Sequence, residues 1–202
     1  MPASGPDPKV EIAVDSVEAA AEAWRLGADR IELCQALEVG GLTPSIGLIE
    51  AVVTEARGPV FAMIRPRPGS FVLQPGDLEV MAKDIDRARR AGCAGIATGA
   101  LTASGRVDAD AVRRLVAAAG GLPVTFHRAF DCLTTGGPDA LAELAALGVE
   151  RVLTAGGAAT VIAAKMLFAR EHWRLGETLP GNPGRAAYAT FTGFVSVLMS
   201  IG

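Results

Sequence analysis

Hydrophobic and polar residues alternate strictly along the motif DRIELC at residues 29–34. Arg30, Glu32 and Cys34 fall on one face of an extended chain, and Ile31 and Leu33 fall on the other. The run is bounded by glycine turns and is too short for a helix, so it predicts a strand. The flanking segments have helical patterns. We therefore expect one face of this strand to be covered by helices and the polar face to line an enclosed interior.

The same strand–helix unit recurs at intervals of roughly 30 residues. The pattern predicts six strands, at residues 9–14, 29–34, 60–65, 94–98, 123–127 and 150–154. Helices are expected between them, at residues 16–26, 45–57, 75–91, 108–119 and 138–147. This alternation predicts an α/β fold with a parallel sheet and helical crossovers.

Two architectures fit that alternation: a doubly wound sheet and a TIM-type (βα)8 barrel. Strands of a doubly wound sheet are apolar on both faces. Here four strands carry a polar residue on one face near the carboxyl end: Glu11, Glu32, Arg65 and His127. Convergence of such side chains is typical of a barrel mouth, which favours the barrel. Only six βα units are recognisable, so we expect the barrel to be incomplete.

The segment after Gly157 has a different pattern. Apolar residues recur there at a spacing of three to four, which predicts a helix near the end of the chain, although the Thr, Val and Phe content leaves a strand open: Ala187, Phe191, Phe194, Val195, Leu198 and Ile201. We expect residues 1–157 to form the barrel region and residues 158–202 a divergent tail. A helix in the tail would not complete the sheet, so we also expect a homo-oligomer formed through the exposed edge.

Composition narrows the function classes. Half of the 202 residues are hydrophobic, 20% are charged, and the net charge of −3 is spread without basic blocks, which argues against a nucleic-acid partner. The longest uncharged run, residues 186–202, is too short and too rich in Ser and Thr to predict a membrane span. The three cysteines lack the spacing of a disulfide framework or a zinc site and are typical of a reducing cytosol.

The polar residues on the expected interior face allow two interpretations. They can form a structural ion-pair network, because unpaired carboxylates in a barrel would be costly. They can also form an acid–base site, with Glu32, Glu11 and His127 as the catalytic candidates and Arg65, Arg67 and Arg128 binding an anionic substrate. His127 is the best candidate for proton transfer, because its ordinary pKa of about 6.5 lies near neutrality.

Four motifs in unbroken order resemble the CutC family, which is named for copper homeostasis. They are DRIELC at 29–34 with GGLTPS at 40–45, MIRPR at 63–67, TFHRAFD at 125–131, and RVLT at 151–154 followed by two glycines. The resemblance covers about residues 10–157 and implies a TIM-type barrel, a cytoplasmic location and an association with Cu(I). Ala13 departs from the family, because many members carry a cysteine there.

In this context Cys34 is a candidate metal ligand, because soft thiolates suit Cu(I). The alternative is a small buried hydrophobe, as most free cysteines are. Met63 shares a strand face with Arg65 and could add a thioether, although a methionine at a strand position is usually part of the core. The leading hypothesis is a cytoplasmic copper homeostasis protein that binds or transports Cu(I), with no organic cofactor. The alternatives are a barrel enzyme acting on a small anionic metabolite and a folded core without activity.

Overall fold

The computed structural model describes residues 9–134, 137–155 and 197–200. Its strands and helices match the expected order, and most boundaries agree within one to three residues. The strands are β1 Glu11–Val14, β2 Arg30–Leu33, β3 Val60–Met63, β4 Gly95–Thr98, β5 Val124–Phe126, β6 Arg151–Thr154 and β7 Val197–Ser200. The helices are α1 Val17–Arg25, α2 Ile46–Thr54, α3 Asp77–Arg90, α4 Ala109–Ala119 and α5 Gly137–Ala146, with short 3-10 turns η1 Leu37–Val39 and η2 Arg128–Cys132.

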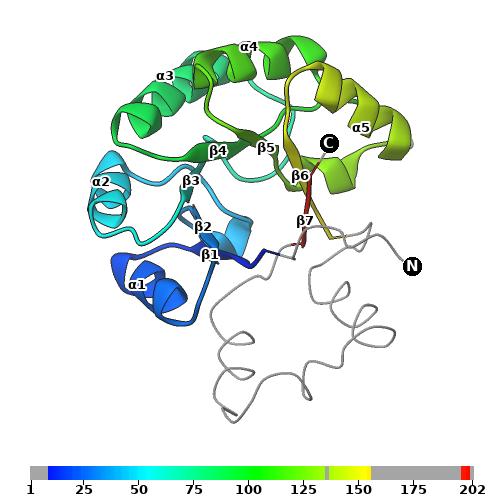
Figure 1. Ribbon diagram of the computed structural model, residues 1–202. Coiled ribbons are helices and arrows are strands. Elements are labelled where there is room, and N and C mark those ends of the chain that lie inside the picture. The colour runs from blue at the N-terminus through cyan, green and yellow to red at the C-terminus, as the bar shows by residue number, and fades with distance from the viewer. Residues whose placement is uncertain (1–8, 135–136, 156–196, 201–202) are drawn as a thin grey trace, which may run out of the picture.

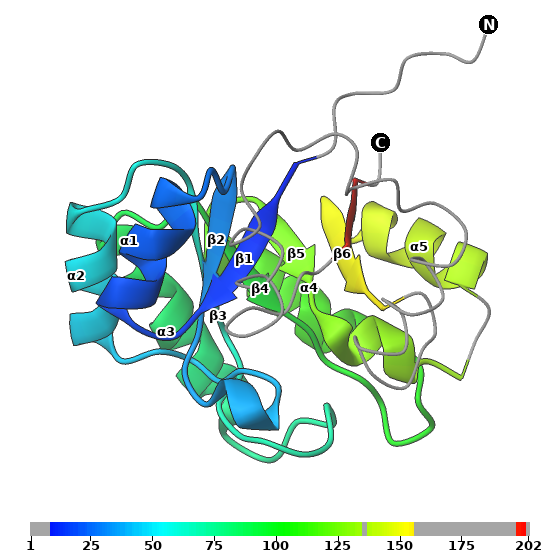
Figure 2. The same cartoon turned by 90° about the horizontal axis from the view of Figure 1, so that it is seen from below.

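The strands form one curved sheet in chain order, with the helices outside the curve (Figures 1 and 2). Each of β1 to β5 pairs in parallel with the next strand. Within the described residues β1 and β7 are the two outer strands and are not paired with each other. The expected incomplete TIM-type barrel is therefore confirmed.

The end of the sheet differs from the expectation. Residues Val197–Ser200 form β7, which pairs antiparallel with β6 in the register Arg151 with Ser200 and Thr154 with Val197. The predicted helix is wrong for these four residues. The physical reason is that the open edge of β6 offers unpaired backbone groups, and pairing with them outweighs a helical spacing of apolar residues. The rest of the predicted tail, and the boundary at residue 157, lie outside the described residues.

Local capping signals explain why the helix boundaries were predictable. Ser16 accepts a hydrogen bond from the backbone N–H of Ala19 at 3.1 Å, and Ser45 accepts one from that of Leu48 at 3.2 Å. Asp108 caps α4 in the same way, accepting from Ala111 at 3.0 Å. Each side chain satisfies a donor that the first helical turn leaves unpaired.

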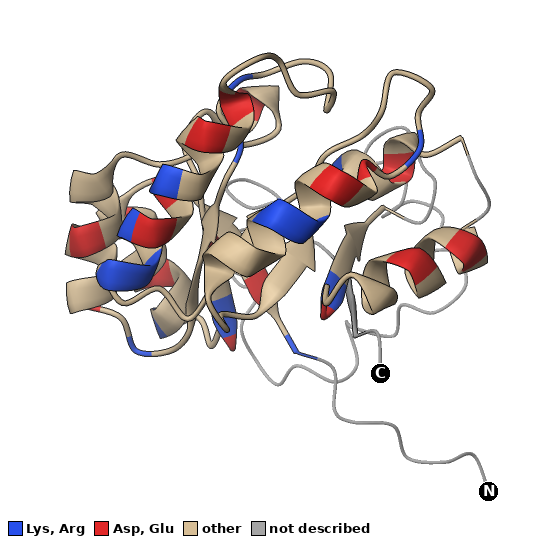
Figure 3. Ribbon diagram, turned by 90° about the horizontal axis from the view of Figure 1, so that it is seen from above, with Lys and Arg blue, Asp and Glu red and all other residues tan. Residues whose placement is uncertain are grey.

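The main hydrophobic core lies between the outer face of the sheet and the helices. Strand residues such as Ile31, Leu33 and Ile96 are completely buried there together with Ile85 of α3 and Leu115 of α4. Acidic and basic residues both lie on the outer surfaces of α3 and α4 (Figure 3), and in α3 the last turn is basic. In the described part of the chain, no helix has the length and hydropathy needed to cross a bilayer.

Candidate functional site

The strand register fixes which residues line the interior of the barrel. Glu11 of β1 lies beside Arg30 of β2, and Glu32 of β2 lies beside Phe61 of β3. The next row along the strands runs through Met63, Ala97, Thr125 and Arg151. Neighbouring residues of a parallel sheet share a face, so all of these side chains point inward. Arg65 and His127 come two residues after members of that row and continue the same face.

Glu11 is at the other end of the interior from the one expected. It is the first residue of β1 and forms an ion pair with Arg30, the first residue of β2, so this pair lies at the amino ends of the strands. The Arg30 guanidinium also lies 4.2 Å from the centroid of the Phe61 ring, and the guanidinium of Arg151 lies 5.3 Å from the same ring. A structural ion-pair and cation–π cluster accounts for this end.

Glu32 has a pKa close to neutrality in the folded protein. It is 6% exposed, and burial, reinforced by the negative charge of Glu11, raises its pKa to about 8 although Arg30 acts in the opposite direction. The carboxyl is therefore mostly protonated at pH 7. Its Oε2 has no hydrogen-bond partner among the described residues, and the same holds for Thr125 Oγ1 and Arg151 Nη1.

A second polar cluster lies at the carboxyl ends of the strands. The Arg65 guanidinium donates to the carbonyl oxygens of Val39 at 3.1 Å, Gly41 at 3.2 Å and Gly69 at 2.9 Å. The same guanidinium lies 4.7 Å from the ring centroid of Phe71, and that ring lies 4.9 Å from the imidazole of His127. Arg65 thus links the loop that contains Val39 and Gly41 to the loop that contains Gly69 by hydrogen bonds.

His127 is neutral in this setting. Complete burial, together with the positive charge of Arg65, lowers its pKa to about 3. Its Nδ1 accepts a hydrogen bond from the backbone N–H of Ala129 at 3.3 Å, which leaves the ring proton on Nε2. The titration near neutrality on which the sequence prediction relied is therefore absent, and Glu32 replaces His127 as the group able to exchange a proton near pH 7.

Two sulfur atoms lie between these polar clusters. Leu33 pairs with Ala62, and one further step in that register brings Cys34 beside Met63. The two side chains are buried in one small cluster with Ala97. A Cβ added to Gly41 would lie 3.6 Å from Cys34 Sγ and 3.5 Å from Met63 Cε, so both side chains end beneath this glycine.

The Cys34 side chain is a neutral thiol. It is completely buried, and its Sγ donates to the carbonyl oxygen of Val14 at 3.5 Å. Burial holds the thiol pKa well above its ordinary value. The other cysteines lie elsewhere: Cys93 in the core on the helix side, and Cys132 exposed in η2.

The side chains of this region suit only a soft metal ion. The described residues contain no group of three or more His, Cys, Asp or Glu side chains that could hold an ion. Cys34 and Met63 together offer a potential thiolate and a thioether, which suit Cu(I) and few other biological cations.

Arg67 and Arg128, which were expected from the sequence to bind an anionic substrate, each form an ion pair within the protein. Arg67 forms an ion pair with Asp77, a buried residue at the start of α3. Arg128 forms one with Asp131, which also accepts a hydrogen bond from the backbone N–H of Ala155. Both arginines therefore stabilise loops at the carboxyl ends of the strands, and Arg67 lines one small pocket together with Arg65.

The sequence did not single out several residues that shape the interior. Arg30 lies on the same strand face as Glu32 in the alternating pattern. This shared face was the feature of the sequence from which its ion pair with Glu11 could have been predicted. Phe61 and Arg151 also follow from parity once the strands are aligned in register. No sequence pattern could predict that Phe71 contacts the interior, because it lies in an irregular loop.

The fold and interior define an incomplete TIM-type barrel with a polar, partly sulfur-lined interior. Comparison with known proteins gives the family. The CutC family model matches residues 8–170, and the chain belongs to the CutC family.

A curated relative from Rhizobium meliloti (strain 1021), named as a CutC family protein, is 50% identical over 151 residues, which are 75% of this chain and 61% of the relative. A human relative named copper homeostasis protein cutC homolog is 49% identical over 147 residues, which are 73% of this chain and 54% of the relative. The chain therefore spans about three fifths or less of the length of these two relatives.

A solved structure of CutC from Streptococcus agalactiae superposes with a TM-score of 0.73 at 31% identity, covering 81% of this chain and 80% of that one. A 2,3-dimethylmalate lyase superposes with a TM-score of 0.52 at 19% identity, covering 93% of this chain and 75% of that one, and is similar in fold alone.

Proposed function

We propose that this protein binds Cu(I) inside the barrel as a cytoplasmic copper-handling protein, with Cys34 and Met63 as the ligands. The observation that carries the proposal is the burial of both sulfur side chains in one cluster beneath Gly41. The name of the human relative, which refers to copper homeostasis, adds support. Cys34 directly follows β2, and Met63 ends the neighbouring strand β3.

Charge balance favours this occupant. Binding displaces the proton of the Cys34 thiol, and the resulting thiolate neutralises the single positive charge of Cu(I). A neutral metal–thiolate pair is compatible with the apolar surroundings that Ala97 and Leu37 supply, whereas a divalent ion would retain a net charge there. Proton release also makes the affinity higher at higher pH.

A Cu(I) titration tests the proposal. The protein competes anaerobically with a chromophoric Cu(I) chelator, and the wild type is compared with Cys34→Ser and Met63→Leu. We expect Cys34→Ser to weaken binding at least about tenfold, equivalent to about 1.4 kcal/mol. Met63→Leu, which conserves volume, should weaken binding without unfolding the protein.

Cys132→Ser is the matched control, because Cys132 is exposed and lies in η2 outside the sulfur cluster. It should leave Cu(I) affinity unchanged. Equal affinity of wild type and Cys34→Ser, or a loss of affinity in Cys132→Ser alone, contradicts the proposal.

A second function, acid–base catalysis on a small anionic metabolite, has its own supporting observation. Glu32 has a pKa of about 8 and can donate or accept a proton near neutrality. His127 would act as a neutral hydrogen-bond donor through Nε2, and Glu11 would tune Glu32 by its charge. In this hypothesis the substrate binds near Arg65.

The cavity of about 330 Å³ that includes Arg65 in its lining lies between α2 and α3, where Asp84 and Arg87 also line it. Neither Glu32 nor His127 lines this cavity, so the substrate of this hypothesis would bind at the Arg65 guanidinium on the inner face. A thermal-shift panel of phosphorylated and carboxylated metabolites tests this function. A true ligand should raise the melting temperature of the wild type and of Glu32→Gln, and lose its effect in Arg65→Gln. Turnover should disappear in Glu32→Gln, and turnover that survives this change contradicts the catalytic role.

A further inference from the structure

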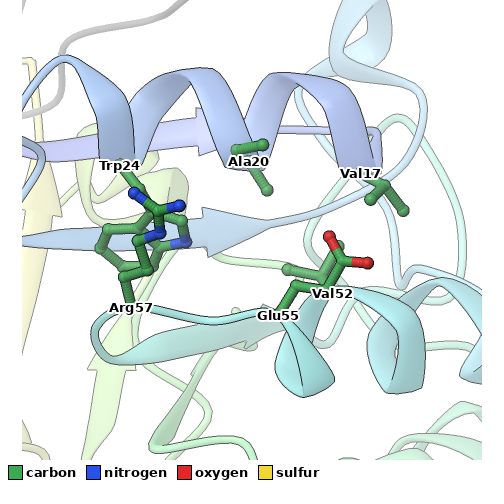
Figure 4. A pocket seen from close by; sticks show the side chains of 7 residues that line it. Val17, Ala20, Trp24, Val52, Glu55 and Arg57 are labelled. Carbon is green, nitrogen blue, oxygen red and sulfur yellow. The ribbon is translucent and has the colours of Figure 1, made fainter.

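A pocket outside the barrel lies between α1 and α2. Its volume is about 260 Å³. Figure 4 shows α1 above the pocket and α2 below it, with Trp24 at one end and Val17 at the other. The lining is mainly apolar and comes from Val17, Ala20, Ala21, Trp24, Val52, Glu55 and Arg57. The proposed copper and acid–base functions use none of these residues.

The indole of Trp24 leaves a hydrogen-bond donor unused. Its Nε1 is buried and has no acceptor among the described residues. An unpaired buried donor costs about 1–3 kcal/mol, so an acceptor placed in the pocket would recover part of that cost. The ring is held against Gly58, because a Cβ there would lie only 2.8 Å from the indole Cζ3. The indole therefore cannot turn toward Gly58 to find another acceptor.

The two charged side chains of the pocket, Arg57 and Glu55, have opposite signs and point toward opposite ends. Figure 4 shows the guanidinium of Arg57 beside the indole, whereas the carboxylate of Glu55 points toward the end formed by Val17. An anionic group is attracted to the Trp24 end and repelled from the Val17 end. Between the two ends, Ala20 and Val52 provide an apolar wall.

We propose that this pocket binds a small monocarboxylate with an apolar body. The carboxylate accepts a hydrogen bond from Trp24 Nε1 and pairs with Arg57, and the apolar body lies along Ala20 and Val52 toward Val17. An alcohol of the same length gains the apolar contacts but not the ion pair. A compound with a second carboxylate at its far end is disfavoured by Glu55.

The test uses Trp24 as its own reporter. Trp173→Phe leaves Trp24 as the single tryptophan of the chain. Octanoate added to this variant should change the Trp24 emission in a saturable way, with 1-octanol binding more weakly and octanedioate weakest. Arg57→Gln should weaken octanoate binding by up to about fivefold, as expected for an exposed ion pair, and leave 1-octanol binding unchanged.

A cavity-filling variant, Ala20→Leu, should abolish binding of octanoate and 1-octanol alike, with a circular dichroism spectrum and thermal melt confirming that the variant is folded. If Ala20→Leu does not fold, Ala21→Leu is used, because Ala21 is exposed at the pocket wall. Equal affinity for octanoate and 1-octanol, or no effect of Arg57→Gln, overturns the proposal. Trp24 emission that changes with protein concentration alone also overturns it and identifies a second copy of the chain as the occupant.

Discussion

The imidazole of His127 occupies the space that a side chain at position 99 would need. A Cβ added to Gly99 would lie 2.8 Å from both Nδ1 and Cε1 of His127. Contacts of this length do not occur between a Cβ and a ring, so the residue that directly follows β4 must be a glycine for His127 to lie inside the barrel. The same relationship recurs at the start of β4, where a Cβ at Gly95 would lie 2.2 Å from the Phe61 ring.

Gly99→Ala should therefore destabilise the protein. Overpacking of a buried site costs about 1–3 kcal/mol, and the imidazole has few ways to move because Phe71 and Phe126 both contact it. Urea unfolding at pH 7 measures the change. Gly47→Ala is the control, because Gly47 lies in α2 with no atom within 4 Å of an added Cβ, and alanine there should stabilise by up to about 1 kcal/mol. Equal effects of the two substitutions would contradict the packing argument.

The pKa of Glu32 predicts a loss of stability at alkaline pH. Its folded value of about 8 lies above the unfolded value of 4.5, so the folded state holds a proton that the unfolded state has released. His127 acts in the opposite direction between its folded pKa of about 3 and its unfolded 6.5. The two slopes offset each other from about pH 4.5 to 6.5, and of these two groups Glu32 makes the larger contribution above that range.

We therefore expect the free energy of unfolding to fall by about 1 kcal/mol between pH 6.5 and 8. Glu32→Gln cannot titrate and should remove most of this slope, whatever its effect at a single pH. Chemical denaturation at several pH values provides the measurement. A wild-type stability that is constant or rising over that interval would show that Glu32 is already ionised in the folded protein.

The three thiols should differ in reactivity. Cys132 is exposed, whereas Cys34 and Cys93 are buried. Burial holds the pKa of Cys34 well above its ordinary value and raises that of Cys93 to about 11, so neither supplies much thiolate at pH 8. Ellman's reagent should modify one thiol rapidly in the native protein and all three after denaturation. In Cys132→Ser the rapid phase should disappear, and a rapid phase that persists would locate an accessible thiol inside the fold.

The open sheet predicts self-association. In the described part of the chain β1 and β7 each have a free edge, and exposed strand edges pair readily with other chains. Sedimentation velocity should show a dimer or larger species forming as the protein concentration rises. Val10→Lys places a charge at the exposed start of the β1 edge and should weaken the association. A strict monomer at the highest attainable concentration would contradict the expected homo-oligomer.

Local chemistry made much of this fold predictable from the sequence. Helix starts could be predicted from the capping residues Ser16, Ser45 and Asp108, and strict alternation assigned Glu32 and Cys34 to one face of a strand. Both kinds of pattern depend only on residues close together in the chain. Parity also put Glu11, Arg65 and His127 on that face. It could not give their depth, which depends on where each strand begins relative to its neighbours.

The sequence by itself thus determined the order of β1 to β6 and of the helices between them, the inward face of four strands and the family. Only the tertiary structure decided that Glu11 pairs with Arg30 at the amino end, that Glu32 and not His127 has a pKa near neutrality, and that β7 joins β6 as an antiparallel strand. The reason is physical: desolvation, charge–charge coupling and edge pairing arise between residues that are distant in the chain, and a linear pattern contains no distances between them.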